Sequence, residues 1–457
     1  MKPGGQDNPV YAELLGETLD AAEWEALLEE AARCGLLRLL VGRIYELHPT
    51  LPVFLRRQLV AAVGEDGLTR LDSEFLNFYT EVAAHFFDAA RKADRNAIAG
   101  LGIEEANLLR ALRLAEKREQ WDKAIQIVQT LYEFYEVTSR TDEWRALRTA
   151  LLDIIGRQAK TSMNHERANL WLSLISNEAY DAIELGNLDH AESGYKQVLD
   201  YMLSLNQPDM EANIARIYHE LGRIAQGRQQ FDIAEQEYKK ALAFFERMGL
   251  ESDAAGGYHQ LGTLADERQQ FEHAEQWYKK AIEIRERLGL DRDAATDYHH
   301  LGILAEKRQQ LDPAEQYYQK ALTIFERLGL QAETATVYHQ LGTLAEERQQ
   351  FGFAEQWYKN ALAIAERLGL RVLMASTLAQ LGLLRRKQGR LPESIAWFGK
   401  ALMIAAQYKM PVGGRILRDL ARLMKSMGEQ EFVAVWRQAF GEEPPLDRLR
   451  EAMKHLE

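Results

Sequence analysis

The feature that most constrains this chain is a block of about 40 residues that recurs five times between Glu211 and Met410. The second and fourth copies read YHQLGTLADERQQFEHAEQWYKKAIEIRERLGL and YHQLGTLAEERQQFGFAEQWYKNALAIAERLGL, and the fifth copy diverges most. A repeat period in this range is typical of an array, in which each unit packs only against its neighbours. The length of 457 residues therefore does not indicate how many separate cores the chain forms.

Each repeat is predicted to hold two helices. In the second copy, apolar residues recur with helical spacing both before and after the tripeptide Arg268-Gln269-Gln270, which marks the predicted turn. These residues are Ala254, Tyr258, Leu261 and Ala265 in the first helix, and Phe271, Ala274, Tyr278, Ala281 and Ile282 in the second.

Glycines predict where the second helices end, and an aspartate predicts where one of them begins. A glycine precedes a leucine at the end of four copies, and glycine suits the left-handed residue that terminates a helix. These glycines are Gly249, Gly289, Gly329 and Gly369. In the third copy, Asp312 is predicted to cap the helix, with Pro313 at its first position and Glu315 three residues after the cap.

Small residues identify the type of repeat. Within the second copy, Gly262 is followed in turn by Ala274, Tyr278 and Ala281, and the same order recurs at the same spacing in the other copies. This pattern resembles the tetratricopeptide repeat, which implies an all-α fold, a right-handed α-solenoid of helix-turn-helix units. The usual unit has about 34 residues and ends with a proline, which is missing here. The longer unit of this chain lengthens the helices by about 9 Å in total.

Upstream of the array, the sequence GLLRLLVGRIYELHPTLPVFLRRQL is not repeat-like. It resembles the end of the winged-helix segment that leads into the helical sensor array of bacterial STAND-type signalling ATPases. The matching residues are Leu36, Leu37, Tyr45, Leu47, His48, Pro49, Leu51, Phe54 and Leu55. The word Glu105-Ala106-Asn107-Leu108 resembles the start of such arrays. The resemblance implies a bacterial sensor module without the nucleotide-binding module, acting with a separately encoded effector.

We expect four parts. They are a helical, winged-helix-like segment at 1–70, an irregular helical region at 71–165, the array at 166–410 with clean repeats from 211, and a C-terminal helical cap at 411–457. In the irregular region, Leu71–Arg95 is predicted as one long helix that Gly100 and Gly102 terminate.

Composition limits the classes of partner. A formal net charge of −13 argues against a general binder of nucleic acid or of an anionic membrane, although a local basic patch stays open. No stretch has the apolar length of a signal peptide or a membrane span, so a cytoplasmic location is expected. The single cysteine, Cys34, excludes an internal disulfide, and we expect it to be a small buried residue rather than a reactive thiol.

The resemblance to tetratricopeptide repeats implies that the first helices line a concave wall that binds a partner. The two positions after the first tyrosine of each copy would offer imidazoles and amides to a protein or peptide. These residues are His219, His259, Gln260, His299, His300, His339, Gln340 and Gln380. The alternative is that duplication copied a residue without a role. Helix packing distances predict that histidines of successive repeats lie about 10 Å apart or more, which disfavours a zinc site.

Acidic residues near the ends of the first helices form a second candidate surface, a negative rim for a basic partner. They are Asp266, Glu267, Glu306, Glu346 and Glu347.

Motifs of known chemistry are missing from the sequence, which holds no P-loop, no HExxH and no GxSxG. We therefore predict a non-enzymatic protein-protein interaction module with no cofactor and no metal. The expected partner is a protein or peptide, with no nucleic acid and no membrane. A structural adaptor or self-assembling scaffold is the alternative, and a homo-oligomer is compatible with both interpretations.

Overall fold

The computed structural model describes residues 21–34, 37–39, 45–47, 51–156, 165–205 and 210–454, and most of them are helical. The fold is an all-α solenoid, as predicted. It divides into two compact units, Met1–Leu185 and Gly186–Glu457. The predicted boundary at residue 70 falls inside a helix, and the four-part division of the chain stays a prediction.

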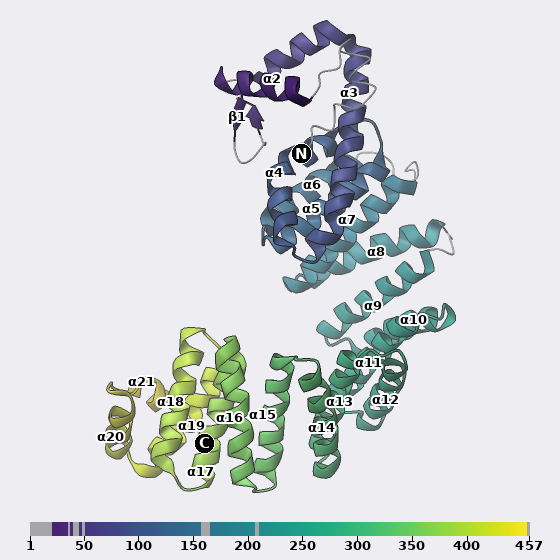
Figure 1. The fold of residues 1–457 in the computed structure, drawn as a ribbon. Coiled ribbons are helices and arrows are strands. Elements are labelled where there is room, and N and C mark those ends of the chain that lie inside the picture. Colours follow the sequence, from purple (N-terminus) through teal and green to yellow (C-terminus); the bar gives the residue numbers. More distant parts are fainter. Residues whose placement is uncertain are drawn as a thin grey trace. The chain divides into compact units, whose positions relative to one another are not determined.

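The first unit holds a short β-hairpin among its helices (Figure 1). Its elements are α2 (Ala21–Arg33), β1 (Leu37–Leu39), β2 (Tyr45–Leu47), α3 (Leu51–Arg91), α4 (Arg95–Lys117), α5 (Trp121–Val137), α6 (Thr141–Gly156) and α7 (His165–Glu184). The two strands are antiparallel, with Leu37 opposite Leu47. The STAND-like sequence thus spans the hairpin and the start of α3, while its His48-Pro49 step lies outside the described residues.

Two expectations about the helices of this unit were wrong. Helix α3 begins at Leu51, bends at Gly64 (φ 72°) and ends at Arg91 rather than at residue 95. Gly100 and Gly102 lie inside α4 instead of terminating a helix. The reason is that the side chain of Asp94 caps α4, accepting hydrogen bonds from the backbone N–H groups of residues 96 and 97 at 2.9 and 3.0 Å.

The expected burial of Cys34 was also wrong, because this residue is exposed just after the end of α2. Leu27 on the same helix is 52% exposed, so the described residues cover this helix incompletely. An apolar sequence around a cysteine therefore did not imply that a core encloses it.

The second unit is a series of antiparallel helix pairs, which Figure 1 shows side by side from teal to yellow. Its helices are α8 (Leu188–Leu205), α9 (Glu211–Gly227), α10 (Phe231–Arg247), α11 (Glu251–Glu267), α12 (Phe271–Arg287), α13 (Asp291–Lys307), α14 (Leu311–Arg327), α15 (Gln331–Glu347), α16 (Phe351–Leu368), α17 (Arg371–Lys387), α18 (Leu391–Gln407), α19 (Val412–Met427), α20 (Glu429–Phe440) and α21 (Leu446–Lys454). The five predicted helix pairs, α9/α10 to α17/α18, are confirmed.

A glycine allows the two helices of each repeat to pack closely. A Cβ atom at Gly262 would lie 2.8 Å from the ring of Tyr278, which is fully buried on the facing helix. The equivalent pairs are Gly222 with Tyr238, Gly302 with Tyr318, Gly342 with Tyr358, and Gly382 with Phe398. Any larger residue would push the two helices apart, which explains why glycine recurs at this position.

Arginines at the ends of the first helices join each repeat to the preceding one. Arg268 follows α11, and its guanidinium lies 3.0 Å from Asp232 and 2.9 Å from Glu235 on α10. The equivalent contacts in the next two repeats are those of Arg308 with Glu272 and Glu275, and of Arg348 with Asp312 and Glu315. Partly exposed pairs of this kind contribute only about 0.2–1 kcal/mol each to stability. Their main effect is to favour one alignment of each repeat on the preceding repeat.

The predicted glycine ends of the second helices are confirmed, whereas the predicted cap at the start of α14 is wrong. Gly369 adopts the left-handed conformation that ends α16 (φ 68°), as predicted, and the three equivalent glycines do the same. Asp312, in contrast, is not the cap of α14, which begins at Leu311 after Gln310. The carboxylate of Asp312 is instead 2.6 Å from Arg348 of the next repeat.

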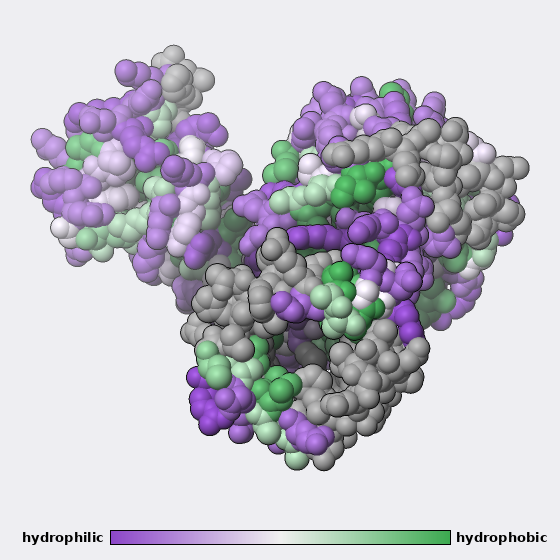
Figure 2. Space-filling view, turned by 90° about the horizontal axis from the view of Figure 1, so that it is seen from above, coloured by the Kyte–Doolittle hydropathy of each residue, from purple (hydrophilic) through white to green (hydrophobic). Residues whose placement is uncertain are grey.

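On the face that Figure 2 shows, the coloured residues are mostly hydrophilic, with hydrophobic residues in patches between them. Among the described residues, no helix combines the length and the apolar content that crossing a bilayer requires.

Replacing Gly262 by alanine should destabilise the array by about 1–3 kcal/mol, because the new methyl group meets the fully buried ring of Tyr278. Gly256 lies on the same helix with nothing within 4 Å of its would-be Cβ. Gly256→Ala should therefore stabilise the helix, by about 0.5–1 kcal/mol. Urea unfolding of the two variants measures both effects, and equal midpoints would contradict the close-packing explanation.

Candidate functional site

The exposed face of the first helices α9, α11, α13, α15 and α17 is the candidate binding surface, and we call it the first-helix wall. Its residues differ from repeat to repeat, although the residues that pack the repeats are nearly constant. Two rows of equivalent positions define it. They are Arg216, Gly256, Thr296, Thr336 and Ser376, followed by Glu220, Gln260, His300, Gln340 and Gln380.

The candidate histidines contact other parts of the array as well as lying along this wall. The Nδ1 atom of His259 is 2.6 Å from Asp297 of the next repeat, and Nδ1 of His339 is 3.0 Å from the hydroxyl of Thr377. The ring of His259 also packs on Tyr278, at 5.7 Å between centroids. One ring nitrogen is thus used between repeats, and we expect mutation of these histidines to alter packing as well as binding.

Histidines of neighbouring repeats lie closer together than helix packing distances predicted from the sequence. The rings of His259 on α11 and His300 on α13 are 5.1 Å apart between centroids. The prediction treated successive first helices as separated by a second helix, whereas their side chains meet along the wall. Even so, no group of three His, Cys, Asp or Glu in the described part of the chain could hold a metal ion.

Burial keeps three of these imidazoles neutral at pH 7. Desolvation lowers the pKa of His299, His300 and His339 to about 4, with smaller contributions from the neighbouring His300, His259 and Arg415, respectively. Neutral imidazoles can both donate and accept hydrogen bonds.

A buried ion pair distinguishes the second and third repeats from the others. Asp297 is completely buried on α13 and accepts a hydrogen bond from Arg285 on α12 at 2.6 Å. In the next repeat, the equivalent residues are the apolar Phe325 and Val337, which are also buried. The ion pair therefore replaces an ordinary core contact, and its carboxylate also orients His259.

The predicted acidic rim is largely occupied by contacts within the array. The hydroxyl groups of Tyr318 and Tyr358 donate to Glu306 at 2.7 Å and to Glu346 at 3.0 Å. Burial raises the pKa of Glu306. Asp266 is paired with Lys307 at 2.7 Å, and Glu346 with Lys387 at 2.8 Å. The side chains of Glu267 and Glu347 are exposed. The acidic rim stays a prediction, with Glu267 and Glu347 as its exposed members.

A shallow pocket of about 590 Å³ opens in the first-helix wall between α15 and α17. Val372, which is 68% exposed, lies at this pocket. The other lining residues are Ala332, Glu333, Thr336, His339, Leu370, Arg371, Leu373 and Ser376. The sequence-based prediction missed this site because it followed the positions that all repeats share, whereas the pocket depends on residues peculiar to the fifth repeat.

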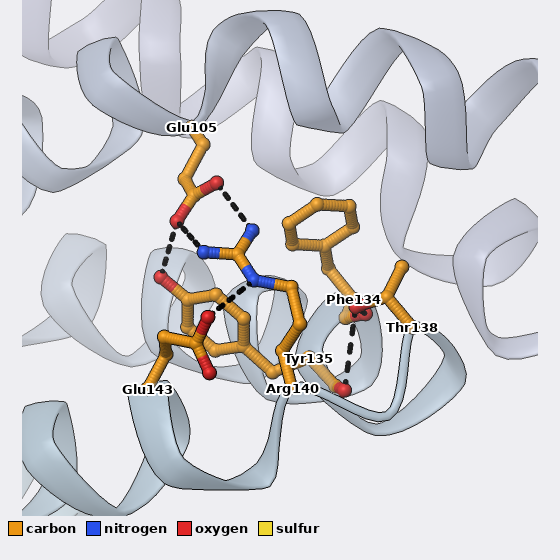
Figure 3. A network of polar contacts seen from close by, with 6 residues as sticks. All are labelled: Glu105, Phe134, Tyr135, Thr138, Arg140 and Glu143. Carbon is orange, nitrogen blue, oxygen red and sulfur yellow. Dashed lines mark hydrogen bonds and ion pairs between the residues drawn. The ribbon is translucent and has the colours of Figure 1, made fainter.

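The first unit contains a polar network that joins three helices (Figure 3). Arg140 donates two hydrogen bonds to Glu105 on α4, at 2.7 and 3.0 Å, and a third to Glu143 on α6 at 2.9 Å. The hydroxyl of Tyr135 on α5 donates to Glu105 at 2.8 Å, and burial with this bond raises the pKa of Tyr135. This arrangement holds α4, α5 and α6 together. Glu105, which belongs to the STAND-like sequence, therefore has a structural role.

Comparison with known families identifies the repeats. The family model described as "Tetratricopeptide repeat" matches residues 213–287, 253–327, 292–367 and 333–407. No curated protein matches the sequence.

Solved structures with similar folds include a STAND protein with a tetratricopeptide repeat sensor, PH0952 from Pyrococcus horikoshii. The TM-score is 0.58 at 15% identity, over 98% of this chain and 62% of that one. BtubC from P. vanneervenii is 24% identical over 49% of this chain and 90% of its own, with a TM-score of 0.44. A Rap protein complexed with competence and sporulation factor is 12% identical over 85% and 99%, with a TM-score of 0.45. Only the first of these similarities is close enough to support the fold.

Replacing Asp297 by asparagine should lower the free energy of unfolding by about 3–5 kcal/mol, because Arg285 then stays buried without its carboxylate. The double variant Asp297→Val with Arg285→Phe copies the apolar pair of the next repeat. It should unfold within about 1 kcal/mol of the parent chain, or be more stable. Urea midpoints measure both, and a double variant as unstable as the single one would show that the ion pair itself is required for folding.

The buried histidines should make the array less stable in acid. Their folded pKa of about 4 lies below the unfolded value of 6.5, so the unfolded chain binds more protons between these limits. Stability is therefore lost as the pH falls from about 6.5 to 4. His339→Gln should reduce this loss by on the order of 2 kcal/mol in urea titrations at several pH values. The matched control, His273→Gln, changes an exposed side chain on α12, and an equal effect of both variants would contradict the role of burial.

Proposed function

We propose that this chain, whose residues 213–407 belong to the tetratricopeptide-repeat family, is an interaction module that holds a partner protein or peptide along the first-helix wall. The wall is the surface that the family resemblance assigns to partners. We infer binding rather than catalysis, since the sequence holds no motif of known chemistry and the wall presents amides, hydroxyls and imidazoles beside Arg216 and Glu220.

One observation carries the proposal, namely the division between constant and variable positions of the repeats. Residues that pack the helices, such as Gly262 and Tyr278, recur unchanged in four copies. Positions on the wall vary, and the row that contains His300 holds glutamate or glutamine in the other copies. Apart from His300, whose ring packs on Tyr278, the wall positions are partly exposed, and their divergence is explained best by contact with a partner whose surface is not repetitive.

The finer proposal is a sensor role in a bacterial signalling or defence system, with a separately encoded effector. It is supported by the fold similarity to the STAND protein with a tetratricopeptide repeat sensor, which extends over 98% of this chain. The STAND-like sequence around β1 and β2 adds to this support. This chain spans 62% of that protein, so the activity of the whole STAND protein is not transferred to it.

A structural adaptor or self-assembling scaffold is the second candidate function. It is favoured by an exposed leucine that recurs in three successive repeats near the end of the second helices. Leu288, Leu328 and Leu368 are 41%, 42% and 42% exposed, and such a row could contact a second copy of the array.

A photo-activated cross-linking residue distinguishes these functions by position. Placed at Thr296 or Thr336 on the wall, it should capture a partner protein in cells. Placed at the exposed His273 or Lys359 on the second helices, it should not. Capture of only this chain itself would favour the scaffold, and capture from the second helices alone would refute the wall as the binding surface. Circular dichroism of each variant verifies that the array is folded.

A further inference from the structure

The C-terminal end of the array reverses the charge of the chain. Between residues 371 and 425, Lys and Arg occur eleven times and acidic residues twice, although the net charge of the whole chain is −13. Both acids, Glu393 and Asp419, are already paired with arginines of the same segment. This segment therefore carries an excess of cations in an otherwise acidic protein, although Arg385 and Lys387 are paired with acids of the preceding repeat.

Two of these cations lie on α19, a helix that packs against α17, and are able to contact a partner. The side chains of Arg415 and Arg418 are exposed, and no carboxylate of the described residues lies within ion-pair distance of either. Arg415 lies near enough to lower the pKa of His339 on α15. Helix α17 supplies Val372, Leu373 and Ser376 to the pocket from its first turns, and Arg415 lies in the first turn of α19, which packs against α17.

The pocket itself is apolar and carries little negative charge. Its aliphatic residues include Val372 and Leu373, at wall positions where the other copies have polar residues or alanine. Its one carboxylate, Glu333, is 2.8 Å from Arg292 and is thereby neutralised. An exposed aliphatic pocket beside unpaired arginines is complementary to a segment that is both hydrophobic and acidic.

We propose that this end of the first-helix wall binds an acidic peptide segment of a partner protein. A hydrophobic side chain of the segment enters the α15–α17 pocket, and its carboxylates lie over Arg415 and Arg418. This inference rests on the proposed function and specifies the class of partner and the place on the wall.

A nucleic acid fits this surface less well, although it is also an anion. Single strands are held by stacking of their bases on aromatic rings, whereas the apolar lining of this pocket is aliphatic. The rest of the chain is acidic and would repel a long polyanion, while a short acidic peptide contacts only the basic end.

The test uses the full chain and a phage-displayed library of random peptides, followed by titration of each enriched peptide by fluorescence anisotropy. Enriched peptides should combine Asp or Glu with a large apolar residue, and their affinity should fall as salt is added. Val372→Asp and the pair Arg415→Glu with Arg418→Glu should each weaken binding about tenfold or more. Lys400→Glu reverses an exposed charge on α18 and is the matched control, which should bind like the parent chain.

Each other outcome is decisive. Enrichment of neutral or basic peptides that bind the Arg415→Glu/Arg418→Glu variant normally would overturn the inference and leave the proposed function intact. Binding of a single-stranded oligonucleotide, but of no acidic peptide, would overturn the inference and assign the basic surface to nucleic acid. If no peptide is enriched and cross-linking at the wall captures nothing, both the inference and the proposed function fail.

Discussion

The close contact between a glycine on the first helix and a tyrosine ring on the second sets the geometry of every repeat. With Gly262 opposite Tyr278, the two helices approach until the ring fills the space that a side chain would take. The ring is completely buried, and alanines at 274 and 281, also fully buried, keep the neighbouring contacts short. Because the same contact recurs once in each repeat, every repeat presents the same surface to the next, and the array grows by stacking.

Polar contacts between repeats favour one alignment of each repeat on the next. Arg268 reaches back to two acids of the preceding repeat, and the hydroxyl of Tyr298 donates to Glu286 of the preceding second helix at 2.7 Å. These polar contacts favour one register over its alternatives. Together with the core they occupy a fixed set of positions, so the remaining positions on the first helices can vary without loss of the fold. The capacity to bind a particular partner follows from this freedom.

The sequence predicted the elements whose cause is local and repeated. Helix pairs follow from the spacing of apolar residues, and the glycine at residue 369 follows from the absence of a Cβ atom. Features that depend on a neighbouring repeat were missed. Asp312, for example, pairs with Arg348 of the next repeat instead of capping its own helix. The same holds for the short distance between histidine rings, which required the stacking of successive first helices. The basic segment 371–425 could have been found by counting charges in a moving window.

The central claim is that folding and recognition use separate residues of the same repeats. A mutational scan of residues 251–330 tests it most directly when each variant is measured twice, for protease resistance and for retention of the partner captured at the wall. The account predicts that packing positions such as Gly262 and Tyr278 affect both measurements. Wall positions such as Gln260 and Thr296 should affect retention alone. The account would be contradicted if substitutions at exposed positions of the second helices, rather than on the wall, abolished retention of the partner while the array stayed folded.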